Sequence, residues 1–391
     1  MMHLFINSLA ASAGGGLTYI RNVLPHLAAE PNVKSTVLLN PGLKQELAVI
    51  PNVDFLEMNV AAGRRFWYEQ SALPGVIRNC HADVLLSTGN FALRKSPVPQ
   101  ILLSRNSIYT SNHYYRDLHS RHEYRAWLDT RLRAVLAKRS ARWADTTVAP
   151  SEAFAAELRR WTGRKVVAIH HGFDHDAFTR DTTPLSADVE RKLQTAEGSL
   201  KLLFVSHYNY YRNFETLITA LPRLRKAFGE RPVKLLLTCE LKAGKNPGSY
   251  RPESAARLVE DLGVSDMVIE LGTVPYRQLH RLYAHADIYV TAAYTETFAH
   301  PLVEAMDSGL PVVASDLAVH REICGPAGAY FPCFSADALA EAVIQVTGSR
   351  ENVASMSAAG VERAKTFSWA AHVKRILLLC HQLIDCRAVA A

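Results

Sequence analysis

The 391-residue chain lacks any apolar run that approaches the roughly 20 residues of a membrane-spanning helix, so the sequence predicts no such helix. It also lacks paired cysteines: its six cysteines include no C-x-x-C pair and no zinc-site spacing. We therefore expect reduced, packed thiols in a cytoplasmic protein. The hydrophobic share of 48% and the charged share of 21% leave ample apolar material for two domain cores, at about 100–200 residues per domain.

The first residues lack the basic charge that opens a secretory signal. Ala11-Ser12-Ala13 fits a small-residue cleavage pattern, but no Lys or Arg precedes the apolar part, and Asn7 interrupts it. We expect instead a buried first strand that runs into a glycine turn.

That turn, Gly14-Gly15-Gly16, lacks the G-x-G-x-x-G spacing of a nicotinamide dinucleotide site. No acidic residue ends the second strand either, where Leu39-Asn40-Pro41-Gly42 stands. Glycines before a helix let the backbone approach a ligand, and the helix N-terminus favours negative charge. Gly15 and Gly16 are therefore candidate phosphate-binding residues, and a plain strand-to-helix turn is the alternative.

Short apolar runs alternate with helical patterns, which is typical of βαβ units and parallel sheets. The expected strands are His3–Leu9, Ser35–Asn40, Val53–Met58, Asp83–Thr88, Gln100–Ser104, Thr146–Ala149 and Lys165–His170, then Lys201–Ser206, Val233–Cys239, Met267–Leu271, Asp287–Ala292, Pro311–Ala314 and Ala329–Phe331. Long helical patterns cover 114–143, 352–365 and 368–387. The prediction is an α/β protein with two doubly wound domains, 1–180 and 201–365, a linker at 181–200 and a final helix at 366–391.

The charge of +7 is confined to the first half of the chain. Residues 1–180 hold 22 basic and 14 acidic residues, hence +8, and the remainder holds 22 and 23, hence −1. Eight of the basic residues lie between Arg116 and Arg142. This stretch fits either an anionic lipid or phosphate-bearing partner, or a solvated helix face.

Glu296 and Glu304 stand on the two sides of a predicted strand-to-helix turn. The buried strand before them ends at the sheet edge where open α/β sheets bind ligands, and Pro301 suits the first helical turn. The N–H groups of Thr297, Phe298 and Ala299 can hold a phosphate, and a carboxylate on the helix can accept hydrogen bonds from sugar hydroxyls. The segment offers both halves of a nucleotide-sugar site.

The segment 295–315 resembles the E-x7-E region of retaining glycosyltransferases of the GT-B fold, family four. The resemblance includes Phe298, Pro301, the Glu-Ala-Met that begins at Glu304, and the Ser-Gly-Leu-Pro that begins at Ser308. It implies two Rossmann-like domains facing across a cleft, an N-terminal acceptor-side domain, a C-terminal nucleotide-sugar domain and a last helix that crosses back. Glu296 is then a catalytic residue and Glu304 a donor-binding one.

A second stretch, 204–213, resembles the same family's V-G-R-x4-K-N pattern. Arg212 takes the place of the Lys that neutralises the donor diphosphate, and its fork suits phosphate. Ser206 and His207 replace the Gly and the Arg. The resemblance implies a catalytic role for Arg212 and His207 and donor binding by Ser206, with an ordinary hydrogen-bonded loop histidine as the alternative for His207.

The first domain departs from the family where a sugar-contacting His is expected. The strand 100–104 runs into Arg105 and Asn106, which are candidates for the acceptor side. The Gly15-Gly16 turn resembles the family's first-domain loop over the donor. His170 and His171 have no third ligand at a suitable spacing and are not expected to bind a metal.

The resemblance implies a retaining, metal-independent hexosyltransferase without a cofactor, which moves a sugar from a nucleotide-diphosphate donor to an acceptor hydroxyl. A glycan or lipid-linked acceptor, in bacterial-type polysaccharide, lipopolysaccharide or glycolipid assembly, is expected, in the cytoplasm or peripheral on the inner membrane face. The alternatives are a nucleotide-sugar epimerase of the same fold and a non-catalytic nucleotide or nucleic-acid binding protein, although nucleic acid is not the expected partner.

Overall fold

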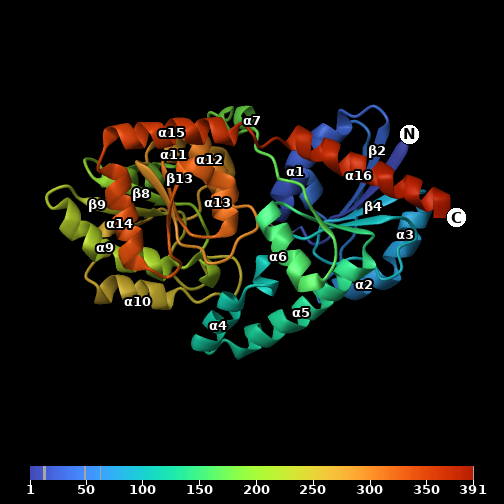
Figure 1. The fold of residues 1–391 in the computed structure, drawn as a ribbon, viewed down its shortest axis with the longest axis horizontal. Helices are drawn as coiled ribbons and strands as arrows, with labels where there is room; N and C mark the ends of the chain where they lie inside the picture. Colours follow the sequence, from blue (N-terminus) through green and yellow to red (C-terminus); the bar gives the residue numbers. More distant parts are fainter. Residues whose placement is uncertain (12–14, 48–49, 62, 391) are drawn as a thin grey trace. The chain divides into compact units, whose positions relative to one another are not determined.

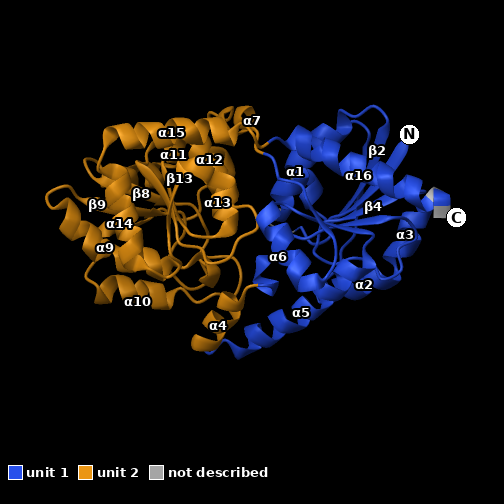
Figure 2. Cartoon of the chain, in the orientation of Figure 1, with its two compact units in different colours: residues 1–110, 122–172, 368–391 blue, residues 111–121, 173–367 orange. Residues whose placement is uncertain are grey.

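The computed structural model describes residues 1–11, 15–47, 50–61 and 63–390, and the chain divides into two compact units (Figure 2). Unit 1 comprises Met1–Thr110, His122–Gly172 and Ser368–Ala391, and unit 2 comprises Ser111–Arg121 and Phe173–Phe367. The chain thus passes from unit 1 to unit 2 after Thr110 and again after Gly172, and it returns after Arg121 and after Phe367. Gly14, which we singled out in the glycine turn, lies outside the described residues.

Unit 1 is built on a parallel sheet in the order β3-β2-β1-β4-β5-β6-β7. Its strands are β1 (Met2–Asn7), β2 (Val33–Leu39), β3 (Val53–Glu57), β4 (Val84–Ser87), β5 (Gln100–Leu103), β6 (Thr146–Ala149) and β7 (Val166–Ala168). Its helices are α1 (Gly15–Ala28), α2 (Arg65–Ser71), α3 (Leu73–Asn79), α5 (Tyr124–Trp143), α6 (Glu152–Thr162) and α16 (Trp369–Ala390), with short 3-10 turns at Leu43–Glu46 and Ser107–Tyr109.

Unit 2 is built on a second parallel sheet in the order β10-β9-β8-β11-β12-β13. Its strands are β8 (Leu200–Phe204), β9 (Val233–Leu237), β10 (Val268–Glu270), β11 (Ile288–Thr291), β12 (Val312–Ser315) and β13 (Gly328–Phe331). Its helices are α4 (Asn112–Ser120), α7 (His175–Thr179), α8 (Ala187–Gln194), α9 (Phe214–Phe228), α10 (Glu253–Asp261), α11 (Leu279–Ala284), α12 (His300–Asp307), α13 (Ala318–Cys324), α14 (Ala336–Thr347) and α15 (Arg350–Ala364), with 3-10 turns at Tyr210–Arg212, Ser265–Met267, Tyr276–Gln278 and Gly325–Ala327.

The expected strands are confirmed to within two residues at each end. Most of them are buried apolar runs, and the edge strands β3, β10 and β13 are partly exposed. In both sheets the strand order reverses beside the first strand, at β1–β4 in unit 1 and at β8–β11 in unit 2. Figure 1 labels β2 and β4 of the first sheet and β8, β9 and β13 of the second. Open α/β sheets bind ligands outside the carboxyl ends of the strands at such a reversal. Two Rossmann-like parallel-sheet units are therefore present, as the α/β prediction required.

The expectation of one long helical region over 114–143 is wrong. The chain forms α4 and α5 there, separated by a break at His122, whose backbone is left-handed with φ 58°. This conformation cannot continue a right-handed helix. The basic stretch from Arg116 to Arg142 is divided accordingly, and α4 belongs to unit 2 whereas α5 belongs to unit 1.

The last helix, α16, packs in unit 1 against α1. Tyr19 on α1 is buried, and its hydroxyl lies 3.0 Å from Nε2 of His372 on α16. A Cβ on Gly172 would lie 2.0 Å from the backbone nitrogen of Trp369, so only glycine fits this close approach. The ring centres of His171 and Trp369 lie 5.4 Å apart, so His171 belongs to the same aromatic cluster.

Candidate functional site

The loops after β8 and β11 meet at the strand reversal of unit 2. β8 and β11 are hydrogen-bonded neighbours, with Leu202 opposite Ile288. Beyond the strands, the backbone N–H of Tyr294 donates to the carbonyl of Tyr211 at 3.0 Å. The two sequence stretches that resemble the glycosyltransferase motifs therefore lie side by side, at the sheet edge where a ligand is expected.

Arg212 and Glu296 form the charged centre of this edge. The Arg212 guanidinium donates from Nη1 to Oε2 of Glu296, and both side chains are largely buried, with 21% and 11% exposed. Burial alone would raise the pKa of Glu296, but Arg212 and the N–H of Thr297 hold it below its ordinary value. Burial alone would lower the pKa of Arg212, but Glu296 raises it. The pair is ionised at neutral pH.

The turn that carries Arg212 is fixed by two asparagines. Asn209 caps the short 3-10 turn by accepting from the backbone N–H of Arg212 at 3.2 Å. Asn213 has a left-handed backbone with φ 55°, and its side chain donates to the carbonyl of Ala292 at 3.2 Å while accepting from the Thr216 hydroxyl at 3.0 Å. The asparagine of the motif thus ties the Arg212 turn to the end of β11.

Ser206 and His207 follow β8 directly. The N–H of Ser206 donates to the Thr238 hydroxyl at 2.9 Å, and its own hydroxyl donates to the carbonyl of His207 at 2.8 Å. His207 is exposed as a residue, and partial burial of its ring lowers its pKa. The imidazole is therefore neutral at pH 7.

The turn between Glu296 and α12 is formed by Thr297, Phe298 and Ala299. The N–H of Thr297 donates to Oε1 of Glu296 at 3.0 Å. Ala299 precedes α12 in a left-handed conformation with φ 63°, and the ring of Phe298 is buried 5.4 Å from that of Phe367. Phe298 therefore anchors the turn through its side chain and can offer a ligand only its backbone.

Glu304 lies on α12 and is almost fully buried, with 5% exposed. The Tyr283 hydroxyl donates to its Oε2 at 2.9 Å. Burial raises the pKa of Glu304 to about 7, and the Tyr283 hydrogen bond opposes that rise. This carboxyl is therefore half-protonated near neutral pH, whereas Glu296 is ionised.

His320, which the sequence did not single out, lies beside the Arg212–Glu296 pair. Its Nδ1 donates to the carbonyl of Ser315 at 2.8 Å, and its Nε2 is buried with no hydrogen-bond partner among the described residues. Burial lowers the pKa of His320 although Glu296 opposes this. A neutral imidazole at this place offers a buried acceptor to a ligand group.

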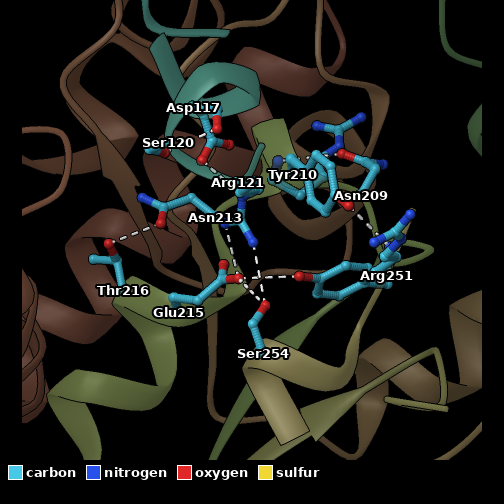
Figure 3. A network of polar contacts seen from close by, with 12 residues as sticks. Asp117, Ser120, Arg121, Asn209, Tyr210, Asn213, Glu215, Thr216, Arg251 and Ser254 are labelled. Carbon is cyan, nitrogen blue, oxygen red and sulfur yellow. Dashed lines mark hydrogen bonds and ion pairs between the residues drawn. The ribbon is translucent and has the colours of Figure 1, made fainter. Parts of the chain in front are cut away.

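A second unpredicted feature is the attachment of α4 to this site (Figure 3). Arg121 donates to Asp117 at 2.7 Å, to Glu215 at 2.9 Å and to Ser254 at 3.2 Å, and its guanidinium lies 4.3 Å from the ring centre of Tyr210. Arg121 is thus fixed within a network and does not serve the lipid or phosphate partner that we considered for the basic stretch.

The same network reaches both loops of the site. Tyr294, two residues before Glu296, donates its hydroxyl hydrogen to Asp117 at 2.6 Å. Glu215 stands in the first turn of α9, three residues after Arg212, and accepts from the Tyr208 hydroxyl at 3.0 Å. No sequence motif marks Asp117 or Arg121, because their partners are far away in the chain.

The remaining predicted residues belong to unit 1. Gly15 is the first residue of α1, and a Cβ on Gly16 would lie 3.1 Å from Cα of Ala11. Arg105 is held by the carbonyl of Thr88 at 3.0 Å and lies 5.0 Å from the ring centre of Tyr19, where burial lowers its pKa to about 10. Asn106 caps a 3-10 turn through the N–H of Ile108. Their roles toward a donor or acceptor stay predictions.

Two family models match the chain. Residues 187–363 match the model described as glycosyl transferases group 1, and residues 13–177 match glycosyltransferase family 4. Together they span most of both units. The chain belongs to the family 4 glycosyltransferases of the group 1 type. The first motif resemblance in the sequence is thereby confirmed at the level of family.

Among curated proteins, a D-inositol 3-phosphate glycosyltransferase of Corynebacterium aurimucosum is 29% identical over 211 residues, which are 53% of this chain and 48% of that protein. The O-antigen chain mannosyltransferase B of Escherichia coli is 35% identical over 99 residues, 25% of this chain and 26% of that protein. The matched region is about half the length of the curated inositol phosphate relatives.

Solved structures support the GT-B architecture. Sucrose-phosphate synthase from Thermosynechococcus elongatus aligns over 99% of this chain and 100% of its own, with 19% identity and a TM-score of 0.76. Anabaena HepE in complex with UDP-glucose aligns over 98% and 100%, with 17% identity and a TM-score of 0.72. At these identities the likeness shows the fold.

Two features are absent from the residues that the structure describes. None of the helices there combines the length and the apolar character that crossing a membrane requires. In the same residues, His, Cys, Asp and Glu side chains form no group of three or more arranged to hold a metal ion.

Proposed function

We propose that the protein is a retaining glycosyltransferase that transfers a sugar from a nucleotide-diphosphate donor to an acceptor hydroxyl. The observation that carries this proposal is the buried Arg212–Glu296 pair at the strand reversal of unit 2. At this edge of the sheet the arginine can bind the diphosphate of a ligand, and the neighbouring carboxylate can accept hydrogen bonds from the sugar hydroxyls of the same ligand.

The chain's own groups supply charge and position in this reaction. The bond between the anomeric carbon and the phosphate oxygen breaks, and a bond to the acceptor oxygen forms on the same face of the sugar. The acceptor proton passes to the departing phosphate oxygen. Arg212 stabilises the negative charge that develops on the diphosphate, without a metal or a cofactor in the proposed mechanism. Glu296 orients the transferred sugar through its hydroxyls.

The donor's other end is assigned to the turn before α12 and to Glu304. We propose that backbone N–H groups of Thr297, Phe298 and Ala299 contact phosphate, and that Glu304 accepts from ribose hydroxyls. We assign Ser206 and His207 to the phosphate side in unit 2. Gly15 and Gly16 of unit 1 are also proposed as donor-binding residues. Arg105 and Asn106 are proposed for the acceptor side.

The acceptor is proposed to be a glycan or a lipid-linked molecule. The curated relatives named above act, by their names, on an inositol phosphate and on an O-antigen chain. They support a role in polysaccharide, lipopolysaccharide or glycolipid assembly as a hexosyltransferase, in the cytoplasm or peripheral on the inner face of the membrane.

A nucleotide-sugar screen tests the donor assignment. UDP-glucose, the ligand of HepE, and other nucleotide sugars are added singly, and the melting temperature is recorded, because a ligand that binds the native state raises it. The ligand that stabilises the wild type should not stabilise Arg212→Ala. Turnover with EDTA present tests metal independence, and the anomeric configuration of the product tests retention.

Two results would contradict the proposal. Interconversion of nucleotide sugars without an acceptor would indicate the epimerase alternative. Stabilisation by nucleic acid, with a steep loss of affinity as salt rises and no donor turnover, would indicate a nucleic-acid binding protein.

A further inference from the structure

Helix α5 exposes a row of large apolar side chains. Tyr124, Leu128, Leu132 and Val135 are between 51% and 59% exposed. Their spacing of four, four and three residues places them on one face of the helix. Single exposed apolar residues are ordinary, but a continuous row on one element marks an interaction surface.

The fully buried positions of α5 carry small side chains. Thr130, Ala134, Ala137, Ser140 and Ala141 face the interior of unit 1, where Ala134 and Ala137 pack with Phe91 and Tyr109. An ordinary surface helix buries its large apolar residues and exposes its polar ones. In α5, Leu136 and Trp143 are partly buried against unit 1, but the four residues of the apolar row face outward, so burial within unit 1 does not explain that row.

The exposed face is also basic. Residues 124–143 contain six basic side chains and one acidic side chain, Asp129, which pairs with Arg133 at 2.7 Å. The remaining arginines of the helix, Arg125, Arg131, Arg139 and Arg142, are exposed and lie on or beside the apolar row. Within this face no carboxylate of α5 is left to offset them.

We propose that this face of α5, defined by Tyr124, Leu128, Leu132 and Val135 with the four arginines, binds the surface of an anionic lipid membrane. A helix of this type lies in the interface, where apolar side chains enter the boundary of the acyl chains and cations meet anionic headgroups. This inference rests on the proposed function in one respect: a lipid-linked acceptor would be held at the same membrane surface.

The charge of the α5 face favours a lipid membrane over a second copy of the chain as its partner. A two-fold dimer through this face would bring the same patch of both copies together, and with it arginine against arginine. Such like-charge contacts oppose association. A lipid surface with phosphate headgroups matches both the apolar row and the cations.

The test is co-sedimentation with vesicles, and two variants separate the two contributions. Arg125→Gln/Arg131→Gln/Arg139→Gln/Arg142→Gln removes the cations, and Leu128→Ser/Leu132→Ser/Val135→Ser removes most of the apolar row. The control Lys374→Gln/Leu378→Ser changes a cation and a leucine on α16, where Leu378 is 60% exposed. Vesicles of phosphatidylcholine alone are compared with equal parts of phosphatidylcholine and phosphatidylglycerol.

Wild type and control should bind the anionic vesicles at low salt and come off as salt rises. Each arginine near an anionic surface strengthens binding by about fivefold, so the Gln variant should bind at least about a hundredfold more weakly. The Ser variant should also bind more weakly, while every variant melts as the wild type does.

Equal recovery of the wild type from both vesicles, or no loss in either variant, overturns the proposal. A concentration-dependent dimer that the Ser variant abolishes assigns the face to a second copy and overturns it as well. Donor turnover is measured separately with vesicles absent. If the protein turns over the donor but does not bind vesicles, the membrane proposal is wrong and the proposed function stands. If it binds vesicles but turns over no donor, the proposed function is wrong and the membrane proposal stands.

Discussion

Tyr294 donates its hydroxyl hydrogen to Asp117 at 2.6 Å, and this bond joins α4 to the turn that carries Glu296. Asp117 also accepts from Arg121, which in turn contacts Glu215 at the start of α9. Helix α4 therefore contacts both loops of the candidate site through two neighbouring charged residues. We infer that Asp117 and Arg121 are positioning residues for the donor site.

Asp117→Ala should lower donor kcat/KM by about tenfold or more, because a hydrogen bond to a charged group contributes about 1.5–3 kcal/mol and its loss frees the Tyr294 turn. Tyr294→Phe should produce a smaller loss, because Asp117 keeps its bond from Arg121. In steady-state kinetics the double variant should be no worse than Asp117→Ala alone, since both changes remove the Asp117–Tyr294 bond.

Ser120→Ala is the control for this cycle, because the Ser120 hydroxyl donates to the carbonyl of Asp117 on the same helix and not to its carboxylate. It should turn over as the wild type does. Strictly additive effects of Asp117→Ala and Tyr294→Phe would show that the two residues act independently and would remove the positioning role.

Arg212→Ala should lower kcat by at least about a hundredfold, as removal of an electrostatic stabiliser commonly does. It should also lower the free energy of unfolding by about 3–5 kcal/mol, because Glu296 is left buried without its partner. Arg212→Met/Glu296→Gln should recover stability but not activity. Chemical denaturation and initial-rate measurements on the same samples check both effects.

The matched control is Arg225→Ala on α9. Arg225 pairs with Asp266, but 46% and 69% of the two side chains are exposed. An exposed pair contributes about 0–1 kcal/mol, so stability and rate should hardly change. Normal turnover by Arg212→Ala would mean that the diphosphate binds elsewhere.

Local patterns were sufficient for the strands, and the two motifs were sufficient to assign Glu296 and Arg212 to one donor site. Each of these residues follows a largely buried strand, β11 and β8. The sequence did not predict that β8 and β11 are neighbours in the sheet, because strand order depends on pairing between distant segments. It did not predict their ion pair, which depends on side-chain directions that only the folded loops determine.

Features that depend on distant partners were missed. The break at His122 requires a left-handed residue that no glycine marks, so α4 and α5 were expected as one helical region. Arg121 was counted with the basic stretch, although Asp117 and Glu215 neutralise it. His320 carries no motif, and only the fold places it beside Glu296.

His207→Arg should flatten the pH dependence of donor binding. Burial lowers the pKa of His207, so its positive charge develops only below about pH 6.5 and donor KM should fall as the pH drops through that region. An arginine is charged throughout, so KM in the variant should stay low up to pH 8. His285→Arg, at another exposed histidine of unit 2, is the control. An unchanged pH profile in His207→Arg would show that His207 is an ordinary loop histidine.

Because Glu304 loses its proton as the pH rises, the free energy of unfolding should fall and donor affinity should rise. Its pKa is raised from 4.5 to about 7 by burial, so the unfolded chain releases this proton first as pH rises. The free energy of unfolding should therefore fall between about pH 4.5 and 7, by up to roughly 3 kcal/mol. Donor affinity should rise over the upper part of that range, because the carboxylate is the better acceptor for ribose hydroxyls.

Glu304→Gln should remove the pH dependence of stability, raise stability at pH 8 and weaken donor binding. The control Glu341→Gln, on the exposed face of α14, should have none of these effects. Denaturation curves and donor titrations at pH 5 and pH 8 separate the two effects, and tight donor binding by Glu304→Gln would place the ribose away from α12.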